Sequence, residues 1–577
     1  MSENPSEKGS NQESTEKMYS YNNSSKNENS QNIVQSQAIR RSIGGNETIN
    51  KEKDNIKYTN NLNNANFPSY KEDNINNNKL NTINYNNSNN FNFRGSLNNS
   101  RASIIHIEPN PPFLWVIFLA FIIIQFAFII VFGFYYLWDS DLNHPKLIDI
   151  INNCKAKMDI QQKYNSLQDM TVVIFLGFGF LRAFLKHHSW SAITFIFIGG
   201  ILSFEFGLIC LITWNSLISK KWFDGYYNFN YFFDGLYISA SFVVSFGSYM
   251  GKLSFIQYYI IILIETVFST LNYIIIRHSM KLIDIGGTLT VHLFGAIFGA
   301  TFSIFYFCNK NESERINTSI HKGYDHNSIL FALFGSLLII PYWPSFNTAL
   351  VTGNLKYRGI INTYFAIGGS IIGMFAISFL LNNKKIKVQD LLYASFPGAI
   401  IIGGCCHIIR QYYLCILFGI IASGVCCLLV YLFYTKLDII RNKYHDTTQI
   451  LFYHGIPAIL GGIFSAIFIG DLNNWKDFEN FKYKIFIGTF QSTSDYDGNH
   501  NVSGKAGAMF GAIFITLILA GFSGLLIGFS VKYCNCNMAL RYFNDSEFFD
   551  SSENEPFPWI DERVEIKFDD KINKNQI

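Results

Sequence analysis

Long apolar runs separated by short polar links dominate the chain between residues 111 and 533. A helix needs about 20 mostly apolar residues to cross a hydrocarbon core, and most of these runs reach that length. Backbone groups in lipid must bond to one another, so runs of this length are predicted to be helices. We count twelve of them, at residues 112–138, 169–186, 192–218, 231–251, 254–276, 286–308, 327–347, 360–381, 390–408, 411–434, 451–470 and 506–533. The pattern predicts an all-α polytopic membrane protein with about twelve transmembrane helices.

Polar segments flank this region on both sides. Residues 1–110 are dominated by Asn, Ser, Lys and Glu and bury too little apolar surface to offset chain entropy, so we predict a disordered tail. Residues 534–577 lean acidic and are predicted to form a cytoplasmic tail. An even number of spans puts both termini on one side. Because no secretory signal begins at Met1, we place both termini in the cytoplasm, with residues 111–533 as the transmembrane domain.

The composition agrees with a membrane protein. The chain is 49% hydrophobic and only 15% charged, whereas soluble domains carry about 25% charged residues. The net charge of +3 gives no indication of a nucleic-acid partner. The lipid bilayer is therefore the first partner that the sequence predicts.

Ionisable groups inside apolar runs are expensive and usually functional. Two histidines stand out there, whereas His407 ends its run and has no matching partner. They are His292 and His454, and each is preceded at eight residues by an aspartate, Asp284 and Asp446 respectively. Eight residues rise about 12 Å along a helix. This spacing places each aspartate near a membrane surface and each histidine part-way into the core.

The positions of these segments predict an internal repeat. If the first span is an extra N-terminal helix, His292 lies on the fifth of the remaining helices and His454 on the tenth. A repeat with an odd number of helices is inverted across the membrane, and transporters of this plan have their site at the repeat interface. We therefore predict two inverted five-helix repeats and a final helix. The histidines would meet near the middle, with the aspartates on opposite sides.

The histidines and aspartates could also have purely structural roles. A single intramembrane histidine often serves as a hydrogen bonder between helices, and Asp284, next to Gly286, could act only as a helix cap. Two copies at one spacing, five helices apart, favour a transport site over both structural readings.

Several of these segments resemble one family. The segment 284–299 resembles the fifth pore helix of the Rhesus glycoproteins, and 453–462 resembles their second-histidine helix. The stretch Tyr342-Trp343-Pro344-Ser345-Phe346-Asn347 and the residues from Gln168 to Leu181 resemble further parts of the same family. The resemblance covers about residues 111–533 in order. The twelve-span count suits this branch, which carries an extra helix before the eleven shared with ammonium transporters.

The resemblance implies a homotrimeric channel in the plasma membrane, with one pore through each subunit. It implies that ammonium or methylamine is recruited at the surface and that neutral ammonia crosses a narrow apolar lumen, without enzymatic activity, cofactor or metal. His292 and His454 match the twin pore histidines. Asp284 matches the aspartate that shapes the ammonium-recruiting vestibule, and Asp446 is its inverted counterpart.

The gate of the pore is where the chain departs from the family. Phe346 matches one of two stacked gate phenylalanines, but the other position falls on Tyr237, whose hydroxyl would change the polarity of the constriction. Phe232 or Phe233 could fill the position if the alignment shifts by one helical turn.

The physical chemistry of the pair is compatible with this implied role. An ammonium ion in a dry lumen would have to give up its hydration at high cost, which neutral ammonia avoids. Two neutral imidazoles can share one N–H···N bond, and each keeps a further nitrogen for a solute.

Two other functions are consistent with parts of the pattern. A Rhesus-like protein could conduct carbon dioxide or act as a sensor or scaffold, although a purely structural role would not require two intact intramembrane histidines. A metalloenzyme using His292 and His454 would need a third or fourth ligand, and no His or Cys lies at a matching depth.

Overall fold

The computed structural model describes residues 111–135, 137–138, 154–185, 188–220, 226–227, 229–307, 326–351, 353–436, 444–471, 502–533, 545 and 549. The chain divides after Ala102, and all of these residues belong to Ser103–Ile577. The predicted tails at 1–110 and 534–577 lie outside the described residues, apart from Asp545 and Phe549.

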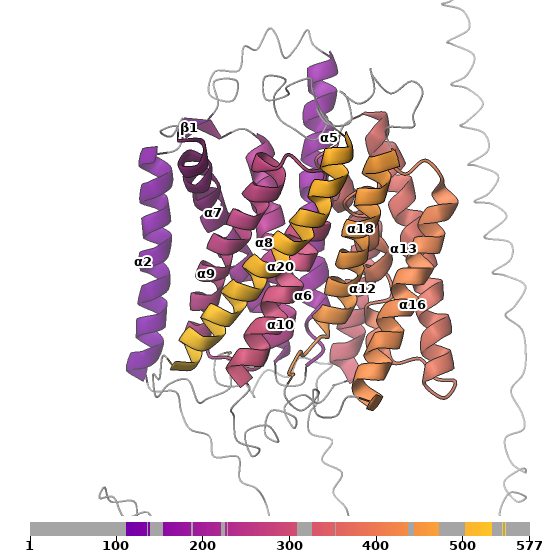
Figure 1. The fold of residues 1–577 in the computed structure, drawn as a ribbon. Coiled ribbons are helices and arrows are strands. Elements are labelled where there is room, and N and C mark those ends of the chain that lie inside the picture. The colour runs from indigo at the N-terminus through magenta and orange to yellow at the C-terminus, as the bar shows by residue number, and fades with distance from the viewer. Residues whose placement is uncertain are drawn as a thin grey trace, which may run out of the picture. The chain divides into compact units, whose positions relative to one another are not determined.

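Each of the twelve apolar runs contains helix, which confirms the all-α prediction (Figure 1). The first half comprises α2 (Pro111–Tyr135), α5 (Cys154–Thr171), η1 (Val172–Gly177), α6 (Phe178–Leu181), α7 (Ser189–Ser219), α8 (Phe229–Tyr249), α9 (Phe255–Ile274), η2 (Ile275–Ser279), η3 (Thr288–Leu293) and α10 (Phe294–Phe307). The second comprises α12 (His326–Thr348), α13 (Asn354–Leu381), α14 (Val388–Leu392), α15 (Phe396–Ile401), α16 (Tyr412–Lys436), η4 (Leu451–Gly455), α18 (Ile456–Asp471) and α20 (Val502–Tyr533). The η segments are π-helical turns, in which the backbone is wider than in an α-helix.

One small element of β structure accompanies the helices. The two-residue strands β1 (Leu137–Trp138) and β2 (Tyr226–Tyr227) pair in parallel, with Leu137 opposite Tyr226. They join the segments that follow α2 and precede α8, and they do not alter the helical class.

The helices have the length and surface of membrane spans. Within the described residues, eight helices are long and apolar enough to cross a bilayer. Large apolar side chains stay on the outside of these helices; Ile372, Leu380 and Ile518 are each about two-thirds or more exposed, at 67%, 72% and 68%. Exposed apolar side chains of this size fit lipid or a neighbouring subunit better than water.

One run differs from a simple span. Residues 390–408 form α14, α15 and a series of turns instead of one helix. Pro397 lies in the first turn of α15, where a missing N–H is tolerated. After α15 the helix ends, and the chain continues in turns that include Gly403. Broken backbone at membrane depth needs partners from neighbouring helices. Here Ala399 O accepts a bond from Asn347 Nδ2 and Ile400 O accepts one from Thr288 Oγ1, both at 2.9 Å.

The segments that carry the two histidines repeat one local geometry. In the first half, Gly286 N–H donates to Gly403 O at 3.0 Å, and in the second Thr448 N–H donates to Gly247 O at 3.1 Å. The next residue is left-handed in both copies, with φ of 65° at Gly287 and 58° at Gln449. Glycine adopts this conformation freely, whereas a side chain makes it costly. The recurrence of these features fits the two predicted repeats.

Close helix packing holds the second half together. On α13 a Cβ at Gly369 would lie 2.2 Å from Ile416 O, and on α16 a Cβ at Gly419 would lie 2.1 Å from Ala366 O. Only glycine allows the two backbones to approach this closely. The last helix, α20, packs across α9, α10 and α18 and is the oblique yellow helix in Figure 1. The final helix thereby contacts helices of both halves.

Candidate functional site

His292 and His454 meet in the core, and we call them the histidine pair. Their Nδ1 atoms are 3.3 Å apart and their ring centroids 5.4 Å apart, with the rings nearly stacked. His292 is 2% exposed and His454 is fully buried. The Nε2 atoms of both rings have no hydrogen-bond partner among the described residues. The structure thus brings together the two histidines that the repeat predicted to meet.

Aromatic rings enclose the pair. Trp343 lies 5.8 Å and Phe346 lies 6.1 Å from the His292 ring, measured between centroids. Phe178 and Phe396 lie 6.2 Å and 5.2 Å from the His454 ring. All four aromatic side chains are buried, so the pair has an apolar setting.

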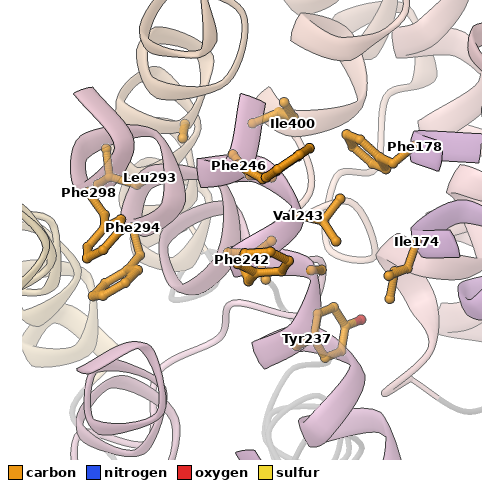
Figure 2. Packing of buried hydrophobic residues seen from close by; sticks show 14 of the residues in the cluster. Ile174, Phe178, Tyr237, Phe242, Val243, Phe246, Leu293, Phe294, Phe298 and Ile400 are labelled. Atoms are coloured by element: carbon orange, nitrogen blue, oxygen red, sulfur yellow. The ribbon is translucent and has the colours of Figure 1, made fainter. Parts of the chain in front are cut away.

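Further apolar side chains come from several helices to the same region. Figure 2 shows Val243 of α8 facing Ile174 of η1 and Phe178 of α6, with Ile400 of α15 near them. All four belong to one buried cluster. An ion placed here would gain few polar contacts in exchange for its water.

The carboxylate of Asp284 binds the start of η3. It accepts bonds from the N–H groups of Leu289 and Thr290, at 3.2 and 2.9 Å, and from Thr290 Oγ1 at 2.9 Å. Arg277 Nη1 donates to the backbone carbonyl of Asp284 at 2.8 Å. The side chain is fully buried. Asp284 therefore holds the turn that carries His292, instead of lying at an open surface.

Asp446 makes the corresponding but weaker attachment. Its Oδ2 accepts a bond from Leu451 N–H at 3.2 Å and one from the Tyr444 hydroxyl at 2.6 Å, while Oδ1 has no partner among the described residues. Burial raises the pKa of the Asp446 carboxyl, although the bond from Tyr444 opposes this shift. The two aspartates thus act on equivalent turns with unequal numbers of bonds.

Tyr237 and Phe346 lie together beside His292. Their ring centroids are 5.1 Å apart in an edge-on arrangement, and the Tyr237 hydroxyl donates to Phe346 O at 2.6 Å. Phe233 is buried, and Phe232 packs on Phe204 with their ring centroids 6.0 Å apart. Because its proton is bonded to a carbonyl near the end of α12, the hydroxyl caps that helix.

The hydroxyl of Tyr237 gives a first prediction. Tyr237→Phe is expected to lower the free energy of unfolding by about 0.5–1.5 kcal/mol, because one buried hydrogen bond is lost and Phe346 O is left unpaired. Thermal unfolding of the purified protein measures this. Tyr357→Phe is the control, since Tyr357 is 60% exposed. Equal midpoints for the two variants would show that the bond does not stabilise α12.

Sequence reasoning gave no role to three rings of the enclosure, Phe178, Trp343 and Phe396, nor to Arg182, which lies behind the Phe178 ring. Phe178 and Phe396 give no signal of their own, because the chain contains 56 phenylalanines. Trp343 belongs to the stretch 342–347 that carries the family resemblance, but the sequence assigned it no role in the site. Arg182 gives a clear signal, since it is a charged residue inside the run at 169–186. It is fully buried, and its Nη1 donates to the hydroxyls of Tyr393 and Thr448.

The described residues contain no group of three His, Cys, Asp or Glu side chains that could hold a metal ion. Among the described residues, the histidine pair thus has no third side chain of these types with which to bind a metal ion.

Comparisons with known proteins identify the fold and the family. Residues 150–549 match the profile of the Ammonium Transporter Family. The ammonium transporter Rh type C of Canis lupus familiaris is 29% identical in an alignment of 440 residues, which covers 73% of this chain and 90% of that protein. The ammonium transporter Rh type B-A of Xenopus laevis is 28% identical in an alignment of 425 residues, which covers 71% of this chain and 87% of that protein.

Among solved structures, Rh50 of Nitrosomonas europaea, described as one of the Rhesus family of channels, superposes with a TM-score of 0.53. It is 22% identical, and the match covers 68% of this chain and 93% of that one, which shows a shared fold. The chain belongs to the ammonium transporter family, and its similarity within that family is to the Rhesus branch.

Proposed function

We propose that the chain is a channel that conducts ammonia, and methylamine, as neutral molecules past the histidine pair. The observation that carries the proposal is the contact of 3.3 Å between the two Nδ1 atoms inside a buried aromatic enclosure. Membership of an ammonium transporter family supports the choice of solute.

The hydrogen-bonding capacity of the pair suits a small neutral solute. When one Nδ1–H donates to the other Nδ1, the donor ring keeps a bare Nε2 and the acceptor ring carries its proton on Nε2. Both Nε2 atoms lack partners among the described residues. One can therefore accept a hydrogen bond from ammonia while the other donates one.

The same setting disfavours cations. An ammonium ion has four N–H groups that must all be satisfied, and the rings of Trp343, Phe346, Phe178 and Phe396 offer no oxygen ligands. Desolvating the ion without replacement ligands costs far more than desolvating ammonia. Ammonium therefore leaves one proton to water at the mouth of the path, and only ammonia reaches the pair.

The other predicted site residues have roles in this proposal. Tyr237 and Phe346 form the constriction next to His292, and their buried edge-on contact supports that assignment. Asp284 and Asp446 position the turns that carry the histidines, and the field of Asp284 favours ammonium at its end of the path.

The experiment is flux into vesicles that contain the purified protein and an internal pH dye. A pulse of ammonium salt should raise the internal pH faster than in empty vesicles, and methylamine should do the same. A parallel arm with carbon dioxide tests the alternative channel function. Vesicles that respond no faster than empty ones to ammonium and methylamine would refute the proposal.

Assembly and placement are part of the proposal. The resemblance to Rhesus proteins favours a homotrimer in the plasma membrane with both termini in the cytoplasm. Native mass measurement of the detergent-solubilised protein tests the trimer, and protease accessibility in intact cells tests the placement of the termini.

Deleting residues 1–100 gives a second prediction. We expect trimer assembly and flux per channel to stay as in the full chain, because this segment has no apolar periodicity and precedes the first span. Native mass and vesicle flux are the measurements. Loss of the trimer on deletion would assign the tail a role in assembly.

A further inference from the structure

The two ends of the histidine pair are not chemically equivalent. On the His292 side, Trp343, Phe346 and Asn347 follow one another on α12, and Trp343 lies against the His292 ring. On the His454 side, Phe178 of α6 lies against the His454 ring and Arg182 follows four residues later. Trp343 to Asn347 is also a step of four. Asn347 and Arg182 therefore occupy corresponding places in the two repeats.

The surroundings of the two residues support this correspondence. The Asn347 side chain fills the space beside Gly286, where an added Cβ would lie 2.6 Å from Asn347 Oδ1. The Arg182 side chain fills the space beside Gly247, where an added Cβ would lie 2.5 Å from Arg182 Cζ. Gly403 and Gly286 share the backbone bond of one repeat, and Gly247 and Thr448 share that of the other. A neutral amide at one end is thus replaced by a guanidinium at the other.

The charge of Arg182 is not neutralised through its hydrogen bonds. Nη1 donates to two neutral hydroxyls, those of Tyr393 at 2.8 Å and Thr448 at 2.5 Å. Nε and Nη2 have no hydrogen-bond partner among the described residues, and the side chain is fully buried. Arginine stays protonated in proteins. A full positive charge therefore persists inside the fold.

This charge lies beside the proposed ammonia path. The Phe178 ring is 5.7 Å from Arg182 Cζ and 6.2 Å from the His454 ring centroid, so one aromatic ring separates the guanidinium from the pair. Thr448 belongs to the segment between Asp446 and His454. A buried charge next to a narrow path acts on a permeating ion with little screening, and arginine serves in this way in pores that exclude cations.

We propose that Arg182 determines charge selectivity: it is a fixed positive charge on the Asp446 side of the histidine pair that rejects cations and leaves the passage of neutral ammonia unaffected. The inference rests on the proposed channel function. With both termini in the cytoplasm, this barrier lies in the inner half of the pore, while the Asn347 end stays open to ammonium recruitment. Apolar walls and a like charge then exclude cations together.

The test compares two fluxes in vesicles that contain the full-length protein. Ammonia flux is followed with an internal pH dye, and ammonium and potassium conductance with a voltage-sensitive dye. We expect Arg182→Gln to retain ammonia flux and to raise cation conductance about tenfold or more, as the loss of a nearby buried unit charge would do. Arg182→Lys keeps the charge but loses the planar guanidinium, and its cation conductance should be as low as that of the wild type.

Arg358→Gln is the matched control. It removes the same charge from a half-buried position on α13 and should leave both fluxes unchanged. If Arg182 were only a hydrogen-bonding residue, Lys and Gln at this position would behave alike, which would overturn the proposal. A folded Arg182→Gln trimer without added cation conductance would overturn it as well.

Folding and channel function can be separated from the inference. Arg182→Met serves as a second neutral variant, and failure of both neutral variants to fold while Arg182→Lys folds would assign the charge to folding and refute the selectivity role. A wild type without ammonia flux would refute the channel. If the wild type conducts ammonia and the neutral variants show no added cation conductance, only the role of Arg182 is refuted.

Discussion

Replacing either histidine of the pair by alanine is expected to reduce ammonia flux per folded channel by about tenfold or more. The change removes one partner of the Nδ1···Nδ1 contact of 3.3 Å, and the remaining imidazole loses its bond in a buried site. Leaving a buried polar group unpaired costs about 1–3 kcal/mol, and about 1.4 kcal/mol on a barrier is a tenfold change in rate. The same loss should lower the free energy of unfolding by a comparable amount.

Initial flux into vesicles, normalised to folded trimer, measures the effect. His407→Ala is the control, because His407 is also fully buried with no hydrogen-bond partner for either ring nitrogen among the described residues. The double variant His292→Ala with His454→Ala should be little worse than the single ones, since the two rings act as a unit. Wild-type flux in both single variants, at equal expression, would rule out the pair as the conducting element.

Asp284→Ala is expected to damage function more than Asp446→Ala. Asp284 accepts bonds from two N–H groups and one hydroxyl at the start of η3, whereas Asp446 accepts one N–H and one hydroxyl with a single oxygen. Each buried N–H left without an acceptor costs about 1–3 kcal/mol. Loss of Asp284 therefore frees the turn that orients His292, whereas loss of Asp446 removes fewer hydrogen bonds from the corresponding turn.

A variant that keeps the shape of the side chain but not its charge separates positioning from recruitment. Asp284→Asn keeps an acceptor for the N–H groups of Leu289 and Thr290 but removes the negative charge. If the carboxylate also attracts ammonium, the Asn variant should lose flux most severely at low total ammonium and recover at high concentration. Stopped-flow flux across a range of ammonium concentrations tests this. Equal per-channel flux in wild type, Ala and Asn variants would leave Asp284 a structural residue.

Much of the helical architecture could be predicted, because span length is a direct consequence of bilayer thickness. The meeting of His292 and His454 was also predictable, since one spacing occurs twice and an inverted repeat returns both residues to the middle. The run at 390–408 was predicted as a single span, and this was wrong. Hydropathy records only that these residues are apolar, whereas Pro397 and the partners of Ala399 and Ile400 determine where the helix opens.

The finer features of the site depend on contacts that one segment cannot reveal. The direction of the Tyr237 hydroxyl follows from the position of the Phe346 carbonyl on another helix. The aromatic enclosure requires Phe178, Trp343 and Phe396 from three separate elements. The unneutralised charge of Arg182 becomes visible only when its neighbours, Tyr393 and Thr448, are known to be neutral.

The wide sequence separation of the histidine pair has a consequence for biosynthesis. The two rings are 162 residues apart in the chain, yet each depends on the other for its buried hydrogen bond. At about 5–20 residues per second, a ribosome takes roughly 10–30 s to make the intervening segment. Throughout that interval the helix that bears His292 has been synthesised, but the His454 ring that pairs with its imidazole has not. Any product that terminates before Leu451 would lack His454 and therefore the histidine pair.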